Sequence, residues 1–278
     1  MTRGRCLILL LTAFLPFPAS AQLAVSVSLS HTTVLRRESC IATITVKNDS
    51  DVPFVIRSPT EDKDARVSLM IDKGSDRYAA KLMDGPLVPS LALLPEETQS
   101  VRVDVERWYD ISTPQGYTLW AVAEWNGKSY ASALLRFDVV GGLPVTAVTR
   151  GLPGESEHLR RYALRYLTRE RSEHLFICID ENDGLVNCGV FDLGPVIRVF
   201  QPRLDVGREG AVTVLHQSAN GRYVKSLLKS LPDRVTLVEQ SAQKGIEKAE
   251  GGKAEGGKAE GGKAEGGEAL PKVRSGDL

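Results

Sequence analysis

Two cysteines near the middle of the chain are the residues whose spacing most directly suggests chemistry. Cys178 and Cys188 flank Asn182-Asp183-Gly184, a sequence that favours a tight turn between two strands. A three-residue hairpin loop with Gly184 in the left-handed conformation would place Cys178 opposite Cys188 at a non-hydrogen-bonded pair, where side chains approach most closely. The spacing therefore predicts a disulfide between Cys178 and Cys188, with two reduced, buried thiols as the alternative.

The remaining candidates for nucleophilic or metal chemistry are scattered along the chain. Cys40 shares a strand face with Ala42 and Ile44, and this apolar setting indicates a buried, unreactive thiol. The histidines have no metal-binding spacing, and no Cys-x-x-Cys is present. They are His31, His158, His174 and His216. We expect the last two of them at the surface.

No known catalytic or cofactor motif occurs in the sequence. A nucleophile elbow, a P-loop and a dinucleotide-binding fingerprint are all missing. We therefore expect no catalytic residue, no metal site and no cofactor. A triad of distant Ser, His and Asp residues stays open as an alternative, because geometry rather than spacing defines it.

A proline-rich loop has the composition of a stiff binding segment. Gly85, Pro86 and Pro89 restrict or redirect the backbone over residues 84–89. A stiff loop of this kind is suited to insertion into the cleft of an extracellular protease. The residues of this candidate binding loop are Asp84, Gly85, Pro86 and Pro89.

The segments that position these residues alternate between apolar and polar side chains, as strands do. Over residues 22–140, apolar and polar side chains take turns, as they do from Leu23 to Leu29 and around Val101 and Val103. Asn126-Gly127 lies between two such runs and favours a two-residue hairpin turn. Short strands separated by turns predict an antiparallel sandwich of about 115 residues.

Motifs in the second half of this region resemble those of bacterial immunoglobulin-like domains. They are Leu94-Pro95-Glu96-Glu97-Thr98, a valine-rich strand, Trp108-Tyr109-Asp110 and Gly116-Tyr117. The resemblance covers about 120 residues and implies an immunoglobulin-like β-sandwich over residues 22–141. Glu96 stands where a glycine is usual, and Gly116 and Tyr117 are adjacent rather than spaced. The second departure argues against a tyrosine-corner role for Tyr117.

A second β region follows a break in the pattern. Gly141-Gly142, Pro144 and the glycines of residues 151–154 predict a linker over residues 142–158. Further alternation, with a hairpin around Asn220-Gly221, predicts a smaller β domain over residues 159–240. Its hairpins resemble blades of a β-propeller, but the region holds fewer than the four blades that close one. We therefore expect a β-meander, and an all-β fold class for the chain.

The two ends of the chain predict processing and disorder. Arg3, Arg5, an apolar block over residues 6–17 and small residues before Gln22 are typical of a secretory signal peptide over residues 1–21. We expect cleavage after Ala21, export to the periplasm or the cell exterior, and no membrane span after cleavage. Lys-Ala-Glu-Gly-Gly repeats four times over residues 248–267, which predicts a disordered tail over residues 241–278.

The charge balance narrows the class of partner. The chain carries 35 basic and 35 acidic residues, so removal of Arg3 and Arg5 leaves 33 against 35. This balance gives no electrostatic basis for binding nucleic acid. We predict an exported, non-enzymatic binding or structural module of the cell envelope, whose partner is an envelope or extracellular protein or a glycan. The alternatives are an inhibitor of an extracellular protease that acts through the loop at 84–89, and a hydrolase with an unrecognised site.

Overall fold

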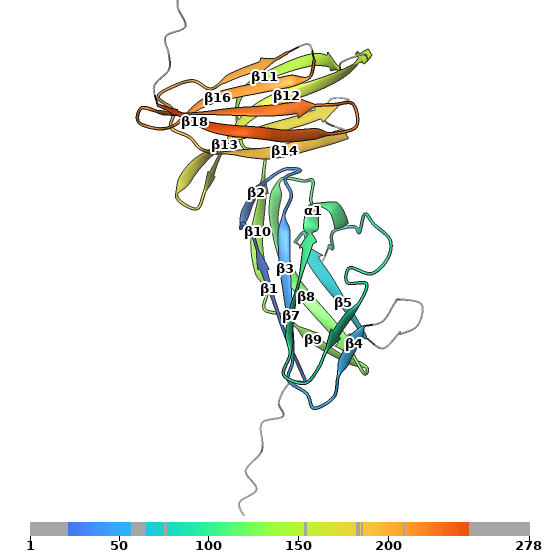
Figure 1. The fold of residues 1–278 in the computed structure, drawn as a ribbon. Helices are drawn as coiled ribbons and strands as arrows, with labels where there is room; N and C mark the ends of the chain where they lie inside the picture. Colours follow the sequence, from blue (N-terminus) through green and yellow to red (C-terminus); the bar gives the residue numbers. More distant parts are fainter. Residues whose placement is uncertain are drawn as a thin grey trace, which may run out of the picture. The chain divides into compact units, whose positions relative to one another are not determined.

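Strands make up nearly all of the structure, so the predicted all-β class is confirmed (Figure 1). The computed structural model describes residues 22–56, 65–74, 77–152, 155–181, 184, 186–207 and 209–244, apart from the side chains of 155–157. The predicted signal peptide over residues 1–21, Asn182 and Asp183 of the predicted turn, and residues 245–278 of the predicted tail lie outside the described residues. Residues 241–244, which we assigned to the tail, belong to the last strand.

The first sheets have the strand order of an immunoglobulin-like sandwich. One sheet contains β1 (Leu23–Leu29), β3 (Ile41–Asn48) and β7 (Thr98–Asp104). The other contains β2 (Thr33–Leu35), β10 (Leu135–Val140), β8 (Gln115–Trp125) and β5 (Ala65–Asp72), with β9 (Lys128–Ala131) paired to β8. The remaining elements are β4 (Phe54–Ile56), its partner β6 (Leu91–Leu93) and the short helix α1 (Val105–Trp108). Thus β1, β3 and β7 correspond to strands A, B and E, and β5, β8 and β10 to strands C, F and G.

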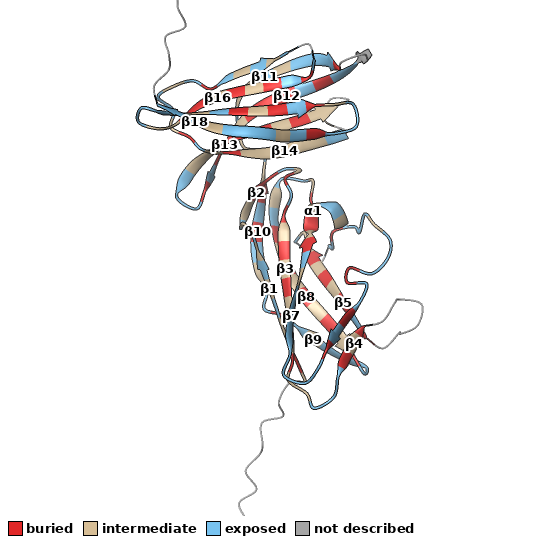
Figure 2. Cartoon of the chain, in the orientation of Figure 1, coloured by how far each residue is buried: buried red, intermediate tan, exposed pale blue. Residues whose placement is uncertain are grey.

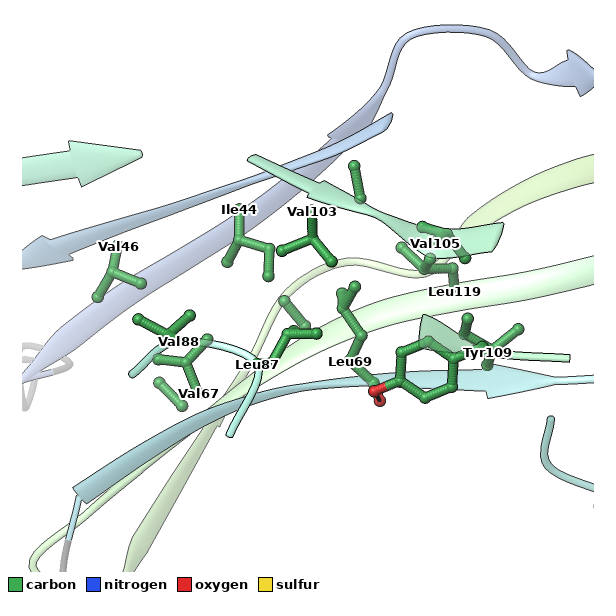
Figure 3. Packing of buried hydrophobic residues seen from close by; sticks show 14 of the residues in the cluster. Ile44, Val46, Val67, Leu69, Leu87, Val88, Val103, Val105, Tyr109 and Leu119 are labelled. Carbon is green, nitrogen blue, oxygen red and sulfur yellow. Dashed lines mark hydrogen bonds between the residues drawn. The ribbon is translucent and has the colours of Figure 1, made fainter. Parts of the chain in front are cut away.

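Inward-facing residues of these sheets build the core of the sandwich, and buried positions recur at every second residue along the strands (Figure 2). On β3, Ala42 and Ile44 are at most 1 % exposed, whereas the residues between and beside them are partly exposed. Leu87 and Val88, from the loop before β6, join the same core and pack near Val67 (Figure 3). The alternation in the sequence therefore reports the buried face correctly.

Tyr117 forms a tyrosine corner, although the motif spacing argued against it. Its hydroxyl donates a hydrogen bond to the carbonyl of Thr113 at 2.8 Å, just upstream of β8. Its ring stacks on Phe137, with centroids 5.3 Å apart. The corner depends on the reach of the hydroxyl to a carbonyl four residues upstream, so the position of Gly116 does not decide it.

The chain beyond Gly142 forms two antiparallel meanders of four strands each. The first contains β11 (Leu143–Leu152), β12 (Glu155–Arg169), β13 (Ser172–Glu181) and β14 (Val186–Pro195). The second contains β15 (Arg203–Val206), β16 (Ala211–Ala219), β17 (Arg222–Ser230) and β18 (Val235–Lys244). Both contribute to one hydrophobic core, with Tyr162 and Leu164 from the first meander and Val212 and Leu228 from the second.

The predicted linker over residues 142–158 is mostly strand, because β11 and the start of β12 occupy it. Gly142 turns the chain with a φ of +66°, and a Cβ at this position would lie 2.6 Å from Leu35 Cδ2. Pro144 is tolerated since β11 is an edge strand whose pairing shifts between Pro144 and Thr146. Gly142 and Pro144, which suggested a linker, are thus a tight turn and an edge-strand irregularity.

A small cluster and a buried ion pair connect the end of β2 to the first meander. Leu35 packs with Leu167 and Phe176. Arg169 donates to both carboxylate oxygens of Glu38 at 2.7 Å, and these two residues are only 5 % and 8 % exposed. Glu38 also accepts the backbone N–H of Leu35 at 2.7 Å. The described residues up to 244 belong to one compact unit.

Candidate functional site: a groove beside strand β5

Strand β5 forms one edge of its sheet, and its backbone groups alternate between pairing with β8 and facing outward. The carbonyl of Ile71 accepts the N–H of Ala79 at 2.8 Å, and the carbonyl of Leu69 accepts the hydroxyl of Tyr109 at 2.9 Å. Alternation puts the N–H and carbonyl of Val67 on the same outer edge. Within the described residues, these two groups have no backbone partner beyond the sheet. This part of the edge therefore has no described strand partner, although Val67 itself is only 5 % exposed.

A groove of about 1010 Å³ lies beside this open edge. Strands β5 and β8 contribute largely apolar side chains to it, including Met70, Trp120 and Val122. The loop before β6 contributes Gly85 and Pro86. Its volume matches the upper end of the range for ligand pockets. An apolar groove beside unpaired backbone groups is the arrangement that receives an extended polypeptide.

The structure brings only part of the predicted binding loop to this groove. Gly85 and Pro86 line it, whereas Asp84 and Pro89 are exposed and do not line it. The intervening Leu87 and Val88 are both buried and line the groove from the core side. The loop is therefore one wall of a groove rather than a freely projecting segment.

Two anchors hold this loop in place. Leu87 and Val88 are 7 % and 2 % exposed in the sandwich core. Lys81 donates a hydrogen bond to the carbonyl of Gly85, and its ammonium lies 5.3 Å from the centroid of the Trp108 ring. The backbone at Gly85, which has a φ of +98°, is thus held by the Lys81 hydrogen bond and by the buried residues that follow it.

One ion pair of the groove is bidentate, and its Trp120 is partly exposed beside Tyr78. Arg66 donates to Glu124 from Nε at 2.6 Å and from Nη2 at 2.9 Å. This bidentate bond lowers the pKa of the Glu124 carboxyl, which therefore stays ionised at neutral pH. Tyr78 is 55 % exposed, and its ring centroid lies 6.1 Å from that of Trp120. The groove therefore favours a ligand that is apolar and weakly charged.

Cys178 and Cys188 are free thiols, so the predicted disulfide is wrong. Cys178 pairs with Val190 for two reasons: Glu181 pairs with Val186, one residue beyond the predicted register, and β14 then bulges at Cys188 between Asn187 and Gly189. The two side chains consequently lie on opposite faces of the sheet. Cys178 packs against the small cluster at the end of β2, and Cys188 packs against the core that the meanders share. The turn sequence carries no sign of this bulge.

All three cysteines of the described chain are poor nucleophiles. Cys40 is fully buried, as predicted. Burial raises the pKa of the Cys40 and Cys178 thiols to about 12, and that of Cys188 to about 11. A thiol with such a pKa is protonated at neutral pH, and the thiolate is the reactive form.

A hydrogen-bonded Ser–His–Asp series lies at the hairpin between β12 and β13. Ser172 Oγ lies 3.0 Å from His174 Nε2, and His174 Nδ1 lies 2.9 Å from Asp192 Oδ2. This is the order of contacts in a catalytic triad, which sequence spacing left open. None of the three lines the groove, and a hydrolase also needs a cleft and oxyanion donors beside its nucleophile. Asp192 lies 3.4 Å from Arg169 Nη1, so we assign the series to the network around Arg169.

The described residues contain neither a metal-ligand cluster nor a membrane-spanning helix. In the described ranges, no three His, Cys, Asp or Glu side chains are grouped as a metal site would need. Across these ranges, no helix combines the length and the apolar character needed to cross a membrane.

Comparison with known proteins identifies no family for this chain. No family profile matches it, and no curated protein matches it. Among solved structures, the sporulation control protein Spo0M from Bacillus subtilis is 13 % identical, with 62 % of this chain and 91 % of that chain covered and a TM-score of 0.29. The CsuC–CsuE chaperone–tip adhesion subunit pre-assembly complex of archaic chaperone–usher Csu pili from Acinetobacter baumannii is 11 % identical, with coverages of 73 % and 96 % and a TM-score of 0.24. Neither likeness carries an argument about function.

The sequence predicted the loop residues that line the groove but not the strand residues that line it. Trp120 and Val122 lie on the outward face of β8, opposite the buried Leu119 and Ala121. An available signal was that this part of β8 is apolar on both faces, whereas a half-exposed strand carries polar residues on its outer face. The open edge at Val67 has no such signal, because it depends on which strand is last in the sheet.

Proposed function

We propose that this protein is an exported, non-enzymatic binding module that takes up an extended segment of a partner polypeptide along β5. The observation that carries the proposal is the outer edge of β5 at Val67, which has no backbone partner among the described residues and borders an apolar groove of about 1010 Å³. A strand that adds to a sheet edge binds through main-chain hydrogen bonds, and a neighbouring groove selects its alternate side chains.

The other outward-facing carbonyls of β5 are already hydrogen-bonded, and this supports a contact with one specific partner. The carbonyls of Leu69 and Ile71 are already hydrogen-bonded to Tyr109 and Ala79. Natural sheets cover their edges in such ways because an open edge pairs indiscriminately with other chains. An edge that is covered at one end and open beside an apolar groove favours one segment in one register.

The residues of the groove indicate the chemistry of the bound segment. Met70, Trp120 and Val122 favour apolar side chains at alternate positions of an added strand. The paired charges of Arg66 and Glu124 favour a segment of low net charge. A glycan, the other class of partner, would stack on aromatic rings such as Trp120 without pairing with the backbone of β5.

The test combines partner capture with amide hydrogen exchange. Protein beginning at Gln22 captures partners from the envelope and culture fluid of the producing cell, and each purified partner is added back during exchange. We expect slower exchange at the Val67 amide, since a hydrogen-bonded N–H exchanges more slowly than a free one. A partner that binds without protecting β5 would contradict strand addition.

A matched pair of variants locates the contact. Val122→Glu places a charge in the groove and is expected to weaken partner binding at least tenfold, because an uncompensated charge is costly to bury. Ser26→Glu places the same charge on an exposed position of β1, in the other sheet, and should bind like the wild type. Equal binding by both variants would exclude the groove as the site.

The rigidity of the loop at 84–89 supports a second candidate, inhibition of an extracellular protease. Lys81 holds the carbonyl of Gly85, and Leu87 and Val88 are anchored in the core. The exposed part of this loop, at Asp84, Gly85 and Pro86, is preorganised and loses little conformational entropy when it enters a cleft. Dose-dependent inhibition that Lys81→Ala weakens would favour this function, and indifference across a protease panel would remove it.

The non-enzymatic part of the proposal is testable at Ser172. We expect a fluorophosphonate probe to leave this serine unmodified in the intact protein, because hydrogen bonding to His174 alone does not supply oxyanion stabilisation. Mass spectrometry of the Ser172 peptide measures the adduct. An adduct that forms in the wild type and disappears in His174→Gln would establish an activated nucleophile and overturn the proposal.

Export rests on the signal-like sequence of residues 1–21. N-terminal sequencing of the protein recovered from the periplasm or the medium is expected to begin at Gln22. Retention of the uncleaved chain in the cytoplasm would contradict this part of the proposal.

A further inference from the structure

A second cavity, of about 290 Å³, gathers arginines from distant parts of the sequence. Arg36 and Arg37 follow β2, and Arg161 and Arg165 lie on β12. A single aspartate, Asp180, also lines the cavity, so the arginines outnumber the lining carboxylate by three. Like charges gathered in this way repel one another until an anion balances them.

Backbone contacts hold two of these arginines in position. The carbonyl of Arg37 accepts the side-chain N–H of Asn187 at 3.1 Å, and Arg165 Nη1 donates to the carbonyl of Gly141 at 2.7 Å. Arg37 has a φ of +68°, a left-handed conformation that an arginine rarely adopts. Such strain persists where the surroundings impose it, and it is frequent at ligand-binding positions.

One donor of a lining arginine lacks an acceptor. Arg37 Nε is buried and has no hydrogen-bond partner in the part of the chain that the structure describes. The ion pair of Arg37 with Glu106 is long, at 3.8 Å from Nη1 to Oε1. Arg36 and Arg161 are exposed, and Arg161 lies opposite Asp180 in the pairing of β12 with β13. A buried donor that lacks an acceptor is costly, and an oxyanion in the cavity would supply acceptors.

We propose that this cavity binds a small oxyanion that carries at least two negative charges, such as a phosphate group or a di- or tricarboxylate. Guanidinium groups form bidentate hydrogen bonds with the oxygens of both kinds of anion. The volume lies at the lower limit for ligand pockets, so one compact group fits rather than an extended chain. The site is separate from the β5 groove, so this proposal does not depend on the strand-binding function.

Isothermal titration calorimetry of the full chain tests this site with inorganic phosphate, sulfate and citrate, at an ionic strength held constant with sodium chloride. We expect saturable one-to-one binding of at least one anion, and the strongest of the three distinguishes phosphate-like from carboxylate ligands. Arg36→Gln and Arg161→Gln should each weaken that binding about tenfold, because each removes a charge-assisted hydrogen bond.

The control is Arg102→Gln, which removes an exposed arginine from β7 and should bind the anion like the wild type. Circular dichroism verifies that each variant is folded. The absence of saturable heat with all three anions would overturn the proposal. So would equal weakening by Arg102→Gln, which would indicate a general effect of net charge.

Discussion

At the scale of single residues, Arg160 shows what burying a charge requires. It is 1 % exposed and donates from Nε to Glu181 at 2.8 Å. Its Nη1 donates to Ser230 Oγ and to the carbonyl of Leu231, both at 2.8 Å. Glu181 belongs to the first meander and Ser230 to the second, so this guanidinium links the two sheets.

We expect Arg160→Met to lower the free energy of unfolding by about 3 kcal/mol, because it leaves the acceptors of this buried network without a donor. Urea denaturation followed by circular dichroism measures the change. Arg222→Met, at an exposed position of β17, is the control and should change stability by less than about 0.5 kcal/mol. An equally small effect at Arg160 would contradict its role.

His216 makes stability depend on pH. We expected this histidine at the surface, but it is 0 % exposed on β16. Burial lowers the pKa of its imidazole below the ordinary 6.5, while the carbonyl of Pro195 and the charge of Asp192 oppose the shift. As the pH falls, the unfolded chain therefore takes up the proton first. The stability that the neutral imidazole contributes is complete above about pH 6.5 and is lost as the pH falls below it.

The corresponding prediction is a lower free energy of unfolding at pH 5 than at pH 7. His216→Leu should reduce this difference, because it removes the group that takes up the proton on unfolding. Denaturant titrations of both proteins at the two pH values measure it. If the variant keeps the full difference, other groups cause the pH dependence.

At the scale of elements, the bulge in β14 decides the chemistry of the cysteines. It directs Cys178 and Cys188 to opposite faces of one sheet. We expect thiol titration of the unfolded, unreduced protein beginning at Gln22 to find three free thiols, and reductant to leave its melting temperature unchanged. A count of one free thiol would show that the two cysteines do form a disulfide, and that the strands pair in another register.

At the scale of the whole molecule, the sandwich and the meanders have separate cores that the Glu38–Arg169 ion pair connects. All three tryptophans lie in the sandwich, at Trp108, Trp120 and Trp125. Their fluorescence therefore reports on the sandwich alone, whereas far-ultraviolet circular dichroism reports on every strand. Coincident transitions by the two probes would indicate that both cores unfold together.

We expect coincident transitions in the wild type and separate transitions in Glu38→Ala, because this change leaves the buried Arg169 with only its longer contact to Asp192 and costs about 3 kcal/mol. Glu239→Ala, at an exposed position of β18, is the control and should unfold like the wild type. Coincident transitions in Glu38→Ala would show that this ion pair does not couple the cores.

Features that depend on local patterns could be predicted from the order of the residues. Side chains of a strand alternate between its two faces, so the spacing of Ala42 and Ile44 sufficed to predict an all-β fold and the buried face of β3. Restricted residues such as Pro86 likewise marked a stiff loop, one part of which lines the groove. These inferences hold because they need only the identities of neighbouring residues.

Features that join distant parts of the chain follow only from its three-dimensional packing. The bulge at Cys188 reflects packing on both faces of a sheet, and the open edge at Val67 depends on β5 being the last strand of its sheet. The cavity of Arg37 and Arg165 brings together residues from the end of β2 and from β12. Strand order, register and the convergence of distant charges follow from which surfaces bury one another, and no local pattern encodes them.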